Sequence, residues 1–93
     1  MNVQTLNAGF SLIPKSTGAP IHIGGTHPRT VRVPGTRRAG LIVHTDNDQL
    51  IYVSPSGSTG ARVGNQLILI NYTLPDKGTL TLGNGESYTI QKH

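Results

Sequence analysis

The sequence predicts an all-β fold, a small antiparallel β-sandwich or jelly-roll-like barrel that carries an extended N-terminal arm. Three observations support this fold class. No window of about 11 residues keeps apolar side chains at helical spacing. Short alternating or β-branched runs recur along the chain. Glycine, proline and threonine recur between these runs, where they act as turn signals.

The 93 residues are enough for one domain, or for one domain and an arm. Residues 1–28 contain Pro14, Pro20, Pro28 and several glycines, with weak strand signals. We therefore expect residues 1–28 to form a partly extended arm that becomes ordered on a neighbour. Residues 29–93 are predicted to form the β-sandwich domain.

The candidate strands follow in chain order, separated by turn signals. We expect them at residues 10–13, 20–23, 29–33, 40–44, 49–53, 66–72, 79–82 and 86–91. The Ser/Gly-rich segment 54–64 is interpreted as a mobile loop. The stretch LPDKG at 74–78 predicts a turn with Pro75 at its second position.

The stretch GLIVHTDNDQLIYV predicts a hairpin. With residues 45–48 as the loop, His44 would lie opposite Gln49 and Ile42 opposite Ile51. Both faces of this hairpin would then be apolar through most of their length. Such a hairpin belongs inside a sandwich or at a contact between subunits.

The stretch LTLGNGESYTI predicts the last hairpin. A two-residue Asn-Gly turn would split its apolar side chains between the two faces. A three-residue loop, 83–85, instead pairs Leu80 with Tyr88 and Thr79 with Thr89. We prefer this loop, with Gly85 in the left-handed conformation as a bulge.

Charge is distributed unevenly. Residues 1–40 carry five of the eight Lys and Arg and no acid, whereas all four acidic residues lie in 41–93. This asymmetry favours an acidic partner for the first part of the chain. Strand alternation places Arg29 on the face of Val31 and Val33, and Arg32 on the other face.

Three readings of this basic stretch remain open: contact with a protein partner, which we favour, a solvated surface, and nucleic-acid binding. Nucleic acid is the least favoured because no aromatic residue lies between Phe10 and Tyr52 to stack on bases. The candidate partner-binding residues are Arg29, Arg32, Arg37, Arg38, Lys15 and Phe10, with Arg32, Arg37 and Arg38 the strongest.

The sequence offers little for catalysis or for cofactors. It contains no cysteine, and its four histidines, His22, His27, His44 and His93, show no metal-ligand spacing. Asp46 and Asp48 suit a turn. No G-x-S-x-G motif or phosphate-binding loop is present. We therefore expect no enzyme activity, no metal and no cofactor.

No apolar run approaches the ~18 residues that span a membrane. The first ten residues lack the basic and apolar regions of a signal peptide. A small core without disulfides favours association with other subunits. We expect a homo-oligomer and no membrane partner.

Two segments together resemble small β-rich virion proteins of tailed bacteriophages. They are AGLIVHTDNDQLIYVSPSGSTGARVG and, later, LTLGNGESYTI, which cover residues 40–64 and 80–90. The shared pattern is a strand, a polar Asn/Asp turn, an IYV-type strand, a Gly/Ser/Thr loop and a closing segment of the form L-x-x-G-E-S-x-T-I. The extra segment 65–78 departs from this pattern.

The resemblance implies a capsid decoration, or cement, protein. Such a protein is made in the host cytoplasm, sits on the virion's capsid surface, often as a trimer, and clamps neighbouring major capsid subunits. A tail or head–tail adaptor component is the alternative within the virion. A small β-barrel nucleic-acid-binding protein, suggested by the same arginines, is the alternative of another class.

Overall fold

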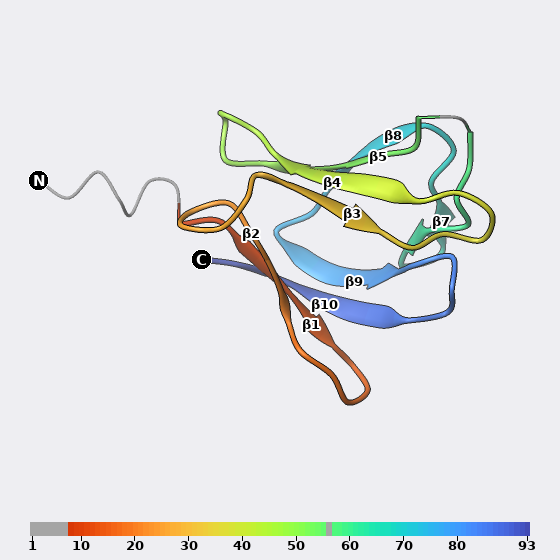
Figure 1. Ribbon diagram of the computed structural model, residues 1–93, viewed down its shortest axis with the longest axis horizontal. Coiled ribbons are helices and arrows are strands. Elements are labelled where there is room, and N and C mark those ends of the chain that lie inside the picture. The colour runs from red at the N-terminus through yellow and green to blue at the C-terminus, as the bar shows by residue number, and fades with distance from the viewer. Residues whose placement is uncertain (1–7, 56) are drawn as a thin grey trace, which may run out of the picture.

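The computed structural model describes residues 8–55 and 57–93, which fold into two antiparallel β-sheets (Figure 1). The described residues contain no helix. The predicted all-β class is therefore confirmed, and the two separate sheets make it a sandwich rather than a closed barrel.

The larger sheet has six strands. β1 and β10 lie side by side near its middle, and β10 also pairs with β9. In spatial order the strands are β2 (Ile21–Ile23), β1 (Phe10–Pro14), β10 (Ser87–Lys92), β9 (Lys77–Thr81), β6 (Arg62–Val63) and β7 (Gln66–Leu67).

The smaller sheet has four strands. β4 and β5 form its centre, and β3 and β8 form its edges. In spatial order the strands are β3 (Thr30–Val33), β4 (Gly40–His44), β5 (Leu50–Val53) and β8 (Asn71–Leu74). The turn at Pro75 thus carries the chain from one sheet to the other, from β8 into β9.

The core lies between the two sheets, and both sheets contribute to it. Its side chains are at most 3% exposed. Tyr52 is the largest of them, and its hydroxyl group is hydrogen-bonded to the Thr59 hydroxyl at 2.5 Å. The members are Phe10, Leu12, Ile23, Val33, Ile42, Leu50, Tyr52, Ala61, Ile68, Leu74, Leu80, Leu82 and Ile90.

The expected N-terminal arm is corrected by the sheet pairing. β1 lies between β2 and β10, so residues 10–23 belong to the sandwich. The prolines that suggested an arm lie at strand ends, where a missing N–H is tolerated: Pro14 ends β1, and Pro20 and Pro28 precede strands. Residues 1–7 of the expected arm lie outside the described residues.

The predicted register of the β4–β5 hairpin was wrong by one residue. Ile42 lies opposite Tyr52 and His44 opposite Leu50, and Thr45 N–H donates to the Gln49 carbonyl, so three residues, 46–48, form the loop in place of the four expected. Asp48 has φ of 59° and donates its N–H to the Thr45 carbonyl at 3.1 Å. An aspartate therefore takes the left-handed position that usually calls for glycine.

The predicted register of the last hairpin is confirmed. Tyr88 lies opposite Leu80 and Thr89 opposite Thr79, and Gly85 has φ of 91°. The turn bond from Gly85 N–H to the Leu82 carbonyl, at 3.0 Å, matches the one in the β4–β5 loop. The two hairpins therefore share one loop design.

The single strand expected over 66–72 is split into β7 and β8, which lie in different sheets. Between them, Ile68 is buried, whereas Leu69 and Ile70 are 61% and 66% exposed. The segment after β5 is not simply a solvent loop, because Ser54, Thr59 and Ala61 are buried and β6 lies within it.

Candidate functional site

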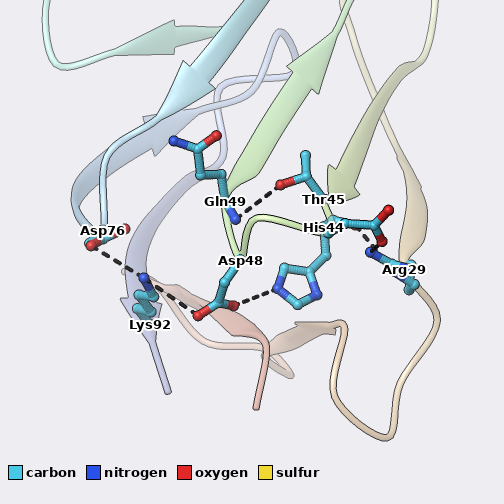
Figure 2. A network of polar contacts seen from close by, with 8 residues as sticks. Arg29, His44, Thr45, Asp48, Gln49, Asp76 and Lys92 are labelled. Atoms are coloured by element: carbon cyan, nitrogen blue, oxygen red, sulfur yellow. Dashed lines mark hydrogen bonds and ion pairs between the residues drawn. The ribbon is translucent and has the colours of Figure 1, made fainter. Parts of the chain in front are cut away.

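A polar network closes one end of the sandwich (Figure 2). His44 Nε2 lies 2.7 Å from Asp48 Oδ1, and Lys92 Nζ lies 3.5 Å from Asp48 Oδ2 and 3.6 Å from Asp76 Oδ2. We call these four residues the polar clasp. It joins the β4–β5 loop of the smaller sheet to β10 of the larger sheet.

One member of the clasp, His44, is buried. The His44 side chain is 2% exposed, and its ring meets Phe10 edge to face at 5.7 Å between centroids. Lys92 Nζ lies 5.8 Å from the centroid of the same Phe10 ring, a cation–π distance. His44 is thus enclosed between the two sheets, whereas Asp48, Lys92 and Asp76 are partly exposed, and Lys92 and Asp76 line a cavity of about 630 Å³ on the surface.

Arg29 lies beside the clasp and is already engaged. Its Nη2 pairs with Asp46 at 2.7 Å, and its Nε donates to the His44 carbonyl at 3.2 Å. The Arg29 and Asp46 side chains are 55% and 92% exposed, so this pair stabilises the fold little.

A histidine cluster lies on the outer side of the larger sheet. The buried Ser11 hydroxyl is within hydrogen-bond distance of His22 Nδ1 (2.7 Å) and His93 Nε2 (2.5 Å), and His27 stacks on His22. In the part of the chain that the structure describes, no three His, Cys, Asp or Glu side chains are placed to hold a metal ion. Residues 8–55 and 57–93 contain no helix that is long and apolar enough to cross a membrane.

The structure separates the six predicted partner-binding residues. Phe10 is 1% exposed in the core, so its assignment as a docking residue is corrected. Lys15 follows β1 and Arg32 lies on edge strand β3, both exposed. Arg37 and Arg38 lie in the β3–β4 loop, beside Ser58 and Gly60.

At the end of the sandwich that bears β7, the β3–β4 loop, β6 and residues 67–70 come together (Figure 1). Backbone hydrogen bonds from segment 54–63 connect the β3–β4 loop to residues 67–70. Thr36 N–H donates to the Thr59 carbonyl. On the other side, Ile68 N–H donates to the Ala61 carbonyl, and Ser54 N–H donates to the Ile70 carbonyl. We call this surface the basic–apolar end, and define it as Arg37, Arg38, Arg62, Leu67, Leu69 and Ile70.

Sequence reasoning found only half of this surface. The two loop arginines were predicted, but Leu69 and Ile70 were assigned to a strand. The signal that could have identified them is the run of four consecutive apolar residues, 67–70, because side chains that alternate along a strand cannot all be buried on one face.

The outer face of the four-stranded sheet is also apolar at its centre. Side chains alternate along a strand. Because Ile42, His44, Leu50 and Tyr52 are buried, the residues next to them along β4 and β5 point outward. We call this outer surface the apolar face, and its members are Leu41, Val43, Ile51 and Val53, all half-buried. The sequence predicted that this hairpin would be apolar on both sides.

Most carboxylates of the chain are already paired. The ion pairs of residues 8–55 and 57–93 engage Asp46, Asp48 and Asp76, and none of them involves Arg32, Arg37 or Arg62. Only Glu86 remains of the four acidic residues. The basic–apolar end therefore finds few acidic groups on a second copy of this chain.

Comparisons with protein-family models, with curated proteins and with solved structures gave no match. The fold and surfaces thus define the class: a small antiparallel β-sandwich with a polar clasp at one end and a basic–apolar surface at the other.

Proposed function

We propose that this chain is a non-enzymatic structural protein that attaches to a larger protein assembly by its basic–apolar end. The observation that carries the proposal is the exposure of Leu69 and Ile70 at the same end as Arg37 and Arg62. Exposed apolar side chains beside polar ones are typical of surfaces that bind proteins.

The chemistry of this end indicates an acidic partner. Arginine forms directional, often bidentate pairs with carboxylates, and a neighbouring apolar contact excludes water from them. The chain's own acids are largely engaged in ion pairs. The partner is therefore a different protein whose surface places carboxylates around an apolar patch.

We further propose that the assembly is the head of a tailed bacteriophage, which the chain decorates from outside by binding the major capsid protein. The resemblance of residues 40–64 and 80–90 to small virion proteins supports this choice. A tail or head–tail adaptor component would use the same docking chemistry, and electron microscopy of virions that carry a labelled chain separates the two.

Nucleic-acid binding is less favoured than protein docking. Phe10, Tyr52, Tyr72 and Tyr88 all pack on the core, so the aromatic rings that stack on bases in single-strand-binding proteins point inward. Phosphate contacts alone would give binding that falls steeply with salt. A gel-shift assay at about 50 mM salt tests this alternative, since such contacts are strong there.

The capsid proposal is tested by sedimenting the chain with undecorated heads of the phage whose genome encodes it. We expect saturable binding and a higher melting temperature of the heads. The double variant Arg37→Glu/Arg62→Glu should lose binding at least ~10-fold, which corresponds to the ~1.4 kcal/mol of one buried charge-assisted bond.

The matched control reverses two charges elsewhere. Lys15 and Lys77 are exposed and lie outside the basic–apolar end, so Lys15→Glu/Lys77→Glu should bind like the original chain. Equal losses in both variants would indicate only general charge attraction. No binding of the original chain to the heads would overturn the decoration proposal.

A further inference from the structure

The two outer surfaces of the sandwich have opposite character. On the larger sheet, the outward positions of β9 and β10 are polar: Thr79, Thr81, Ser87, Thr89 and Gln91. Ile13 of β1, opposite Thr89, is an isolated apolar residue on this face. A solvated outer face of this kind is what an antiparallel sandwich normally shows. The apolar face of the smaller sheet is therefore the exception that needs a cause.

The apolar face is a block of two rows that run across the four strands. Strand pairing fixes each row. One row is Thr30, Val43, Ile51 and Thr73, and the next is Arg32, Leu41, Val53 and Asn71. In both rows the central strands β4 and β5 are apolar and the edge strands β3 and β8 are polar, with Arg32 the single charge.

We propose that the apolar face binds the apolar face of a second copy of this chain across a two-fold axis that runs parallel to β4 and β5. Such an axis places β4 over β5 and β3 over β8 of the other copy. Val43 then meets Ile51, and Leu41 meets Val53. The two sheets pack face to face, at the ~10 Å spacing of a sandwich.

The single charge fits this arrangement. Arg32 of one copy lies over Asn71 of the other, whose side-chain oxygen accepts a hydrogen bond from the guanidinium group. The two Arg32 residues lie at opposite edges, roughly 14 Å apart for three strand spacings. This distance exceeds the ~8 Å Debye length at physiological salt, so their repulsion is screened.

The size of the face sets the strength of the contact. Four strands about 4.8 Å apart, paired over about five residues, cover on the order of 300 Å² on each copy. A stable interface buries 1,200–2,000 Å² in total, so this one is of the weak class. We expect weak, reversible pairing that depends on protein concentration. An assembly that concentrates the subunits would populate it.

This inference does not depend on the capsid proposal, and its test separates the two. The mass of the free chain is measured by sedimentation equilibrium from about 1 µM to 1 mM, concentrations at which dissociation constants in that range give measurable dimer. We expect the measured mass to rise from that of a monomer toward that of a dimer as the concentration increases. Ile51→Lys should remain a monomer, because the lysine is placed between two apolar sheets.

Two controls make the test specific. Thr89→Lys places the same charge at an outward position of a central strand in the other sheet and should leave dimerisation unchanged. Ile51→Thr, which suits an exposed strand, replaces Ile51→Lys if that variant does not fold, and should weaken dimerisation at least about 5-fold.

The position of the axis has its own test. Asn71→Asp should tighten the dimer about 3- to 10-fold, because its carboxylate would meet Arg32 of the other copy, whereas Asn71→Lys should weaken it. Within one chain the two residues are three strands apart and do not reach each other.

Three outcomes would overturn the inference. They are a monomer at every concentration, a dimer or trimer that Ile51→Lys does not affect, and tightening by Asn71→Lys as large as by Asn71→Asp. Heads that bind Ile51→Lys normally but fail to bind Arg37→Glu/Arg62→Glu would leave the capsid proposal intact in each of these cases.

Discussion

Asp48 has both a structural role in the β4–β5 loop and a role in the contact between the two sheets. The residue adopts φ of 59°, and its carboxylate contacts both His44 and Lys92. Aspartate tolerates the left-handed region better than most residues do, because its short polar side chain bonds locally. The same residue therefore shapes the β4–β5 loop and connects the two sheets.

We predict that Asp48→Ala is more destabilising than Asp48→Asn. Alanine has no group to bond the buried His44 ring, which costs about 1–3 kcal/mol. It also occupies the left-handed region at a cost of about 1–2 kcal/mol. Asparagine tolerates this conformation and keeps an oxygen for His44. Urea unfolding of the three proteins gives the order, and an Asn variant as unstable as the Ala variant would contradict this account.

At the scale of the element, the two three-residue hairpin loops explain one correct and one wrong prediction. Gly85 marked its left-handed position directly, and the apolar pattern of the last hairpin then fixed the register. In the β4–β5 loop the same position is Asp48, and both faces of the hairpin are apolar. Hydrophobic pattern cannot choose a register when a one-residue slip exchanges one apolar face for another.

Two glycines with left-handed backbones allow backbone cost to be separated from crowding. Gly85 has open space around the position of a Cβ atom, with no neighbour within 4 Å. At Gly24 (φ +79°) a Cβ would lie 2.1 Å from Nδ1 of the buried His44 ring.

We predict that Gly85→Ala costs about 1–2 kcal/mol, the backbone penalty alone. Gly24→Ala should cost distinctly more, because the enclosed His44 ring must also move. Both values come from denaturant unfolding at one pH, with Gly57→Ala as a left-handed control that also has open surroundings. Equal losses of unfolding free energy for Gly24→Ala and Gly85→Ala would show that the His44 ring moves aside without a measurable loss of stability.

At the scale of the whole molecule, the all-β class and most strand positions could be predicted from the sequence. Residues 10–23, predicted as part of an arm, form the paired strands β1 and β2 and the turn between them, because prolines also occur at the ends of paired strands. The basic–apolar end could not be predicted as a unit. It forms only when segment 54–63 brings the β3–β4 loop and residues 67–70 to the same end.

We predict that deletion of residues 1–28 abolishes folding. The deletion removes Phe10, Leu12 and Ile23, each at most 1% exposed, and leaves β10 without its neighbour β1. Loss of one such Phe side chain alone costs about 3–5 kcal/mol, a large part of the 5–15 kcal/mol that stabilises a typical domain. Circular dichroism and thermal unfolding check this. A shortened chain that still unfolds cooperatively would show that residues 1–28 are a dispensable arm and not part of the folded sandwich.

The contrast between the two outer sheet faces would give a pair of copies a uniform exterior. Two-fold pairing through the apolar face covers that face in both copies and leaves a polar sheet on each side of the pair. Because the axis runs parallel to the strands, the basic–apolar ends of both copies would point in the same direction. One support could therefore hold both copies of a pair at once.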